Sequence, residues 1–230
     1  MANPDKQRGF KPVRMQNGAP YASSNMIYAL IDDSAEKAGD DGFAVGHPVV
    51  LADEANTQTG ALAGFPLATF MTDEHDESDD VVLGVIVGIA SGPFNSGVLD
   101  AGFGAFDPAD LTRTSVTVAE VEADTDGYLL LLAPANDVVF EVQNSAAEAL
   151  HVGTLADVSI ANDEAGVETV GASGYSLYEA NIGGDQMVVV GVPERVDNDA
   201  ELANADMHVV FRLQFGAPGT AGAIGAAPDA

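Results

Sequence analysis

The sequence predicts an all-β protein, a sandwich or barrel of about ten short strands with an extended N-terminal arm and little helix. Short apolar runs rich in valine, isoleucine and leucine recur along the chain, and Gly, Asp, Asn and Pro separate them. The clearest run alternates strictly, so that one face of an extended strand carries Met207, Val209, Phe211, Leu213 and Phe215. Helical periodicity is scarce, which leaves strands as the main element.

The strands are expected where apolar runs of strand length stand between turn-forming residues. These are residues 26–31, 43–51, 66–71, 81–90, 113–122, 128–133, 137–143, 152–160, 186–192 and 207–215. Pro48 should mark an edge or a bend, and Gly84 and Gly88 should permit a bulge or the close approach of another backbone. The pattern of residues 177–182 favours no single structure, while residues 34–38 and 145–151 have helical composition.

Two neighbouring runs, residues 128–133 and 137–143, are separated by a short segment with a proline and an asparagine. Two apolar runs around so short a connection are typical of an antiparallel hairpin. We therefore expect these two strands to pair with each other.

The chain divides by composition into three parts. Residues 1–22 contain three prolines, no periodicity and an Asn17-Gly18 turn signal, which predicts an extended arm. Residues 23–215 form the β-rich body, which is long enough for one domain or two packed lobes. Residues 216–230 are rich in Gly, Ala and Pro and are expected to be a flexible tail.

Charge is distributed very unevenly along the chain. The net charge is −28, yet four of the eight Lys and Arg residues lie among the first fourteen residues, which contain a single acid. The remaining chain has four cations against thirty-five acids. Such a body repels phosphate groups and anionic lipid, so we expect neither nucleic acid nor membrane as a partner.

No motif of a familiar enzyme occurs, and we expect a non-enzymatic protein without a cofactor. The chain has no cysteine, no phosphate-binding loop and no nucleophile elbow, and its four histidines are not spaced as metal ligands. It also has no apolar run near the roughly 20 residues of a membrane helix and no signal-peptide pattern, which predicts a soluble protein made in the cytoplasm. Residues 72–80 contain six acids, a loop in which calcium binding stays open, although the spacing departs from an EF-hand.

Four segments, taken in order, resemble one protein family. They are residues 9–14 (GFKPVR) with residues 17–21 (NGAPY), residues 85–89 (VIVGI), residues 137–143 (DVVFEVQ), and residues 191–198 (GVPERVDN) leading into the last strand. Together they are similar to the structural cement, or head decoration, proteins of tailed bacteriophages. The opening departs in two respects, since family members often have His where this chain has Met15 or Gln16 and have more aromatic residues after the Asn-Gly turn. Residues 72–80 and 216–230 have no counterpart.

The resemblance implies a non-enzymatic virion protein on the exterior of the capsid, made in the host cytoplasm. Its implied partners are the major capsid protein and neighbouring copies of itself, as a dimer or trimer on the shell. The arm would be the docking segment. Its apolar residues Phe10, Val13 and Tyr21 would lie in a groove of a neighbouring subunit, and Lys11 and Arg14 would pair with acids on the capsid or on a neighbouring copy. Two alternatives stay open: a calcium-dependent adhesin or carbohydrate-binding β-module, and an enzyme built from dispersed carboxylates.

Overall fold

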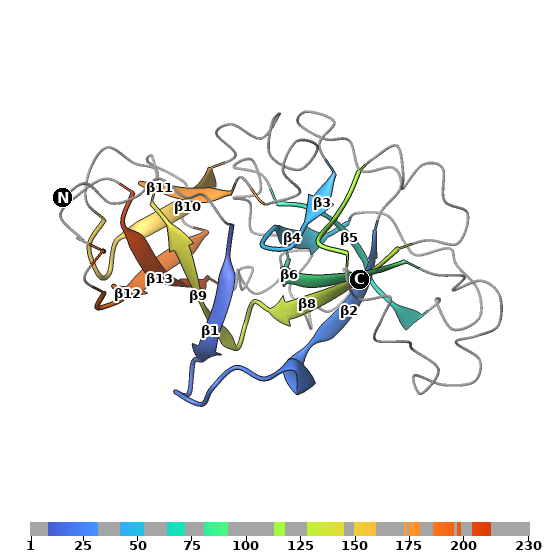
Figure 1. Ribbon diagram of the computed structural model, residues 1–230, viewed down its shortest axis with the longest axis horizontal. Helices are drawn as coiled ribbons and strands as arrows, with labels where there is room; N and C mark the ends of the chain where they lie inside the picture. Colours follow the sequence, from blue (N-terminus) through green and yellow to red (C-terminus); the bar gives the residue numbers. More distant parts are fainter. Residues whose placement is uncertain are drawn as a thin grey trace, which may run out of the picture.

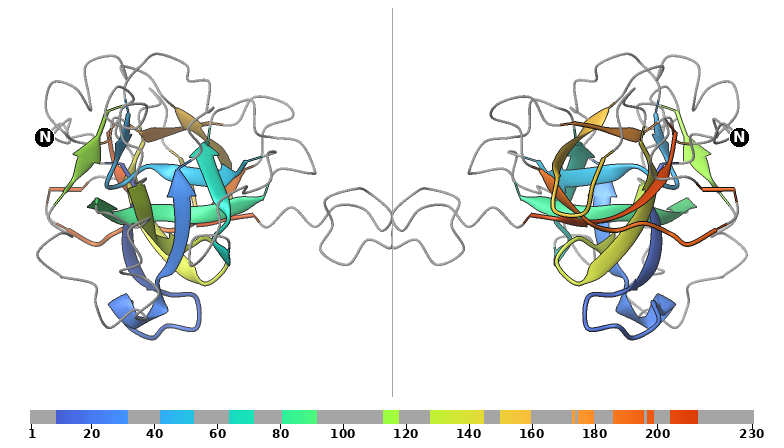
Figure 2. Two further views of the ribbon diagram at one scale, coloured as in Figure 1. Left: turned by 90° about the vertical axis from the view of Figure 1, so that its right-hand side faces the viewer. Right: turned by 90° about the vertical axis from the view of Figure 1, so that its left-hand side faces the viewer.

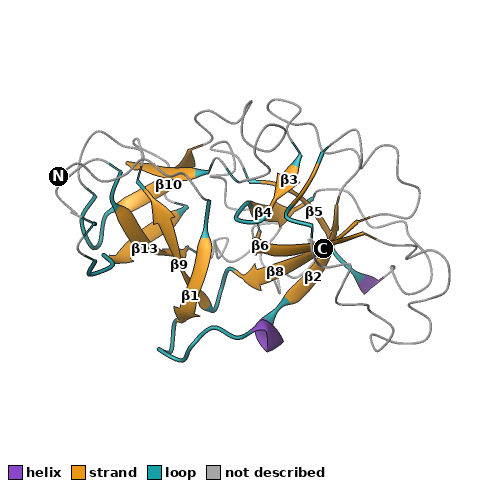
Figure 3. Ribbon diagram, in the orientation of Figure 1, coloured by secondary structure: helices purple, strands orange, loops and turns teal. Residues whose placement is uncertain are grey.

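The computed structural model describes residues 9–31, 42–52, 64–71, 81–91, 113–117, 128–144, 150–159, 173, 175–179, 186–195, 197–198 and 204–212. These residues form an all-β fold, as the sequence predicts, and the 3-10 helix Ser23–Asn25 precedes β2 (Figures 1 and 3). Their thirteen strands are β1 (Lys11–Met15), β2 (Ile27–Ile31), β3 (Phe43–Ala44), β4 (Pro48–Leu51), β5 (Leu67–Phe70), β6 (Val82–Ser91), β7 (Ser115–Val116), β8 (Tyr128–Pro134), β9 (Val138–Gln143), β10 (Leu155–Ser159), β11 (Ser176–Glu179), β12 (Met187–Gly191) and β13 (Asp206–Phe211). No helix in this part of the chain is long and apolar enough to span a membrane.

Five strands close into a barrel in the order β2-β5-β4-β6-β8. The β2–β5 pair is parallel and the other pairs are antiparallel. Apolar side chains such as Ile86, Ile89, Leu130 and Leu132 fill the interior and are fully buried. Strand β8 is apolar without interruption because both of its faces are buried, one in this interior and the other in a second apolar cluster with Leu30 and Ala90.

Six of the remaining eight strands form a sheet in the order β1-β9-β13-β12-β10-β11, antiparallel throughout, and β3 and β7 pair with each other in a separate antiparallel sheet. The predicted alternation of the last strand is confirmed over residues 207–211, because Met207, Val209 and Phe211 are buried while the residues between them are half-buried. A single bridge between Asn144 and Leu177 brings β11 back against the end of β9. The sheet therefore curls around its own apolar interior, as the side views show (Figure 2).

The barrel interior and the sheet interior are separate apolar clusters, but side chains from the barrel also pack into the sheet's core. The apolar cluster inside the sheet also contains Val50, Met71 and Val85, which come from the barrel strands and their ends. The hydroxyl of Tyr175, which precedes β11, donates a hydrogen bond to the carbonyl of Met71 (2.8 Å). The two units are thus packed against each other rather than joined only by the chain.

The expected hairpin of residues 128–133 and 137–143 is wrong. Strand β8 pairs with β2 and β6 in the barrel, whereas β9 pairs with β1 and β13 in the sheet. The three-residue turn between them carries the chain from one unit to the other (Figure 1). The local pattern predicts both strands correctly, but their partners come from distant segments that bury more apolar surface than a two-stranded hairpin would.

The N-terminal segment is also not a free arm over the residues that the structure describes. Strand β1 is an edge strand of the sheet, with Lys11 opposite Glu141 and Met15 opposite Val138. The backbone N–H of Phe10 donates to the carbonyl of Gly46 (2.9 Å), which ties the start of this segment to the barrel side of the molecule. Apolar content in the opening residues therefore reflects burial in the protein's own core.

Gly9 shows why this segment begins with glycine. Its φ is +65°, a conformation that side chains rarely adopt, and a Cβ there would lie 2.2 Å from Oγ of Ser173. The predicted turn at Asn17-Gly18 is confirmed, because Gly18 has φ of +87° and Asn17 Oδ1 accepts a hydrogen bond from the N–H of Ala19 (2.9 Å).

Several expectations fall outside the described residues. They concern the helical composition of 34–38 and of most of 145–151, the acidic segment 72–80, the ends of two expected strands at 118–122 and 213–215, and the tail 216–230.

Candidate partner-binding face

Phe10, the first predicted docking residue, is a core residue. Its side chain is 2% exposed, and its ring contacts those of Phe140 on β9 (centroids 6.5 Å apart) and Phe211 on β13 (5.5 Å). Phe140 and Phe211 also contact each other edge-to-face, 5.4 Å apart. These three rings join β1, β9 and β13 in the interior of the sheet, so Phe10 offers nothing to a partner.

Tyr21 and Val13 are half-buried. Tyr21 packs against the core of the sheet, and burial raises the pKa of its phenol because the charged phenolate loses its hydration. Its hydroxyl is buried without a hydrogen-bond partner in the structure. The structure therefore places the Tyr21 ring against the core of the protein's own sheet.

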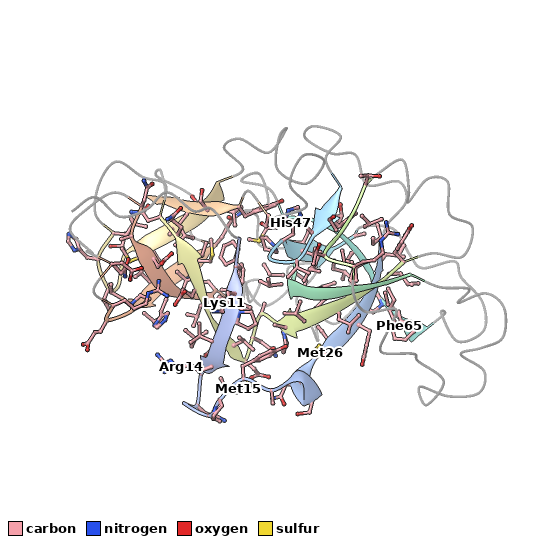
Figure 4. All side chains as sticks on the ribbon, viewed as in Figure 1. Lys11, Arg14, Met15, Met26, His47 and Phe65 are labelled. Atoms are coloured by element: carbon pink, nitrogen blue, oxygen red, sulfur yellow. The ribbon has the colours of Figure 1, made fainter. Side chains whose placement is uncertain are left out.

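Lys11 and Arg14 are the two predicted residues that point away from the core. Lys11 is exposed and stands opposite Glu141, while Arg14 is half-buried and stands opposite Val139 (Figure 4). Lys11 and Arg14 are three residues apart, so in a regular strand their side chains would point to opposite faces. The irregular register between Pro12 and Arg14 shifts the alternation by one residue, and both cations lie on the outer side of the sheet. Pro12 is compatible with this edge strand because an edge strand has neighbours on one side only.

Arg195 also lies on the outer side of β9 and β13, although the sequence pattern around it predicts no role for it. Its guanidinium Nη1 donates to Glu141 Oε1 on β9 (3.0 Å), Nη2 donates to Asp206 Oδ2 at the start of β13, and Nε lies 3.9 Å from Asp197 Oδ1. Burial alone would lower the pKa of Arg195, but the hydrogen bond and ion pairs with these carboxylates raise it above its usual value. Arg195 thereby fastens the segment after β12 across two strands of the sheet.

Asn198 completes that attachment. Its Nδ2 donates to the carbonyls of Pro193 (3.1 Å) and Asp206 (3.0 Å), and its Oδ1 accepts from the N–H of Asp206 (2.7 Å). Residues 191–198 (GVPERVDN) are therefore held in place by their arginine and their asparagine. A signal was present in the sequence, because Arg195 is one of only eight Lys and Arg residues in a strongly acidic chain.

His208 lies in the middle of this face. Its Nε2 is 3.7 Å from Glu141 Oε2, and its ring lies next to Gly191, where a Cβ would be 3.5 Å from the ring Nδ1. Burial lowers the pKa of His208, and the cations Arg14 and Arg195 lower it further, while Glu141 partly opposes them. The histidine is therefore neutral at pH 7.

We expect the free energy of unfolding to fall as the pH drops below about 6.5, the pKa of a histidine in an unfolded chain. The lowered pKa means that the unfolded chain binds a proton at His208 more readily than the folded one, so acid favours unfolding. Urea titrations at pH 7.5 and 5.5 at constant salt should show a larger decrease for the wild type than for His208→Gln. His151→Gln, at an exposed histidine, is the matched control. An equal decrease for wild type and His208→Gln would contradict this role.

Within the described ranges, no group of three or more His, Cys, Asp or Glu side chains is placed to hold a metal ion. No protein-family model, curated protein or solved structure matches the chain. The class of the protein is thus defined by its fold alone, an all-β fold with a closed five-stranded barrel and a curled six-stranded sheet.

Proposed function

We propose that this chain is a non-enzymatic virion structural protein, a capsid decoration protein that binds and stabilises the outer surface of the major capsid shell of a tailed phage. The observation that supports it most is the spatial arrangement of the segments that carry the resemblance. Three of the four belong to neighbouring parts of one sheet, namely β1, β9 and the connection from β12 to β13.

These segments contact one another through the residues that make them distinctive. Phe10 packs on Phe140 and Phe211, while Arg195 binds Glu141. The resemblance thus concerns one packed unit, which is stronger support than four unrelated short matches would give. The fourth segment lies in β6, the long central strand of the barrel.

A decoration protein must bind many equivalent sites on one shell, so each contact can be modest and still hold the particle through avidity. In this proposal the partners are the major capsid protein and neighbouring copies of the chain. Its location is the capsid exterior, after synthesis in the host cytoplasm. The chain, with its net charge of −28, would lie away from the packaged DNA because like charges repel.

The test is co-sedimentation of the full-length protein with DNA-free heads assembled from the major capsid protein of the same genome. We expect the protein to sediment with expanded heads at a fixed ratio and to raise the temperature at which the heads dissociate. Failure to sediment with heads at any salt concentration would refute the proposal. Calorimetry of the isolated protein with millimolar calcium addresses the adhesin alternative, which predicts heat release and a rise in melting temperature.

A further inference from the structure

The cations on the outer side of β1, β9 and β13 differ in whether they already have acidic partners. Arg195 contacts three carboxylates, and His208 shares Glu141 with it. Lys11 and Arg14, on the edge strand β1, form no ion pair in the part of the chain that the structure describes. Glu141 stands opposite Lys11 in register, but its two oxygens are directed to Arg195 and His208.

Cations without acidic partners are informative in this chain. It has thirty-six acids and eight Lys and Arg residues, so a cation meets carboxylates far more often than other cations. Arg195 illustrates the usual outcome, since it gathers its partners from both sheet strands and from its own segment. Among the described residues, the edge strand instead presents two positive groups without an ion pair, and Glu141, the acid opposite Lys11, is directed to Arg195 and His208.

Lys11 and Arg14 are also held in place by the backbone. The strand pairs with β9, and its end is fixed by the bridge between Arg14 and Pro20 and by the hydrogen bond from the N–H of Met15 to the carbonyl of Ala19 (2.8 Å). A partner that binds them would therefore not have to order a flexible segment, which lowers the entropy cost of association.

We propose that Lys11 and Arg14, which we call the cationic edge, bind a carboxylate-bearing surface segment of the major capsid protein. This inference rests on the proposed function. Arginine pairs with carboxylates through two parallel hydrogen bonds, and charges at the rim of an interface mainly set the association rate and the register. A protein carboxylate fits better than nucleic acid. The field of a chain with a net charge of −28 repels a polyanion, whereas a single carboxylate on a protein surface can be bound by Lys11 and Arg14 alone.

Charge reversal tests the cationic edge on the full chain. We expect Lys11→Glu and Arg14→Glu each to weaken binding to the heads by about tenfold and the double variant to weaken it more. Binding of the wild type should also weaken between 0.05 and 0.5 M NaCl, because screening shortens the reach of these charges, and the double variant should lose most of that salt dependence. The matched control is Arg212→Glu, which makes the same charge change at an exposed residue after β13. Circular dichroism and melting temperature establish that each variant is folded.

Three outcomes would overturn this inference without overturning the proposed function. If the double variant and Arg212→Glu bind heads as the wild type does, the cationic edge is not the contact, while the proposed function stands. If the double variant instead changes the oligomeric state of the free protein in sedimentation velocity, the occupant is a second copy of the chain. If the wild type retards duplex DNA and the double variant does not, the occupant is a polyanion. Failure of the wild type to bind heads would overturn the proposed function and this inference together.

Discussion

Replacing Phe10 with alanine is expected to lower the free energy of unfolding by about 3–5 kcal/mol, the usual cost of emptying a buried aromatic site. The ring is 2% exposed and contacts Phe140 and Phe211, so its removal leaves a cavity between three strands. Urea denaturation followed by circular dichroism measures the effect. The same reasoning predicts that deletion of residues 1–20 destabilises the body, because it removes β1 and Phe10 together.

Two variants make the Phe10 result specific. Phe10→Leu keeps much of the apolar volume and should be less destabilising than the alanine variant. Lys11→Ala, at the exposed neighbouring position, should change stability by no more than about 0.5 kcal/mol. If Phe10→Ala kept the wild-type stability but lost binding to heads, Phe10 would be a docking residue and its burial in the core would be wrong.

Gly84→Ala is expected to destabilise the barrel by about 2–3 kcal/mol, as overpacking of a tight interior does. Gly84 lies on β6 opposite β8, and a Cβ there would lie 2.2 Å from the carbonyl oxygen of Ala133. That atom belongs to the backbone of the neighbouring strand, which cannot move without disturbing the hydrogen bonds of the barrel. Thermal and urea denaturation of the purified variant measure the loss.

Gly88, four residues further along the same strand, supplies the matched control. A Cβ at this position would be 3.8 Å from the nearest atoms of Leu131, which is ordinary contact. Gly88→Ala should therefore be neutral or stabilise by up to about 1 kcal/mol, since alanine restricts the unfolded chain more than glycine. Equal stability changes for the two variants would show that the close approach at Gly84 has no energetic consequence.

Strand positions were predictable because burial imposes a local pattern. The long apolar run in β6 and the alternation in β13 both appear as strands close to their expected bounds. A strand that is buried on one face or both must show such a pattern whatever its neighbours are. The close approach of β8 to β6 was likewise predictable from Gly84, since a glycine within a strand often marks a place where another backbone comes close.

Strand partners were not predictable from the same patterns. Strands β8 and β9 follow each other closely, yet each finds its neighbours in other parts of the chain. Likewise, Arg195 binds Glu141, 54 positions away, and nothing local to either residue indicates the pair. Pairing depends on the total apolar surface buried by the whole fold, which no short window contains.

The opening segment shows both sides of this division. Its sequence determined that residues 9–15 are extended, that Asn17-Gly18 turns the chain, and that two cations stand within a mostly acidic protein. Only the tertiary structure decided that the apolar side chain of Phe10 enters the protein's own core while Lys11 and Arg14 face outward. An aromatic residue in an extended segment has the same sequence pattern whether it docks on a partner or on its own sheet. The difference lies in whether the fold provides a cavity for the ring, and here β9 and β13 provide it through Phe140 and Phe211.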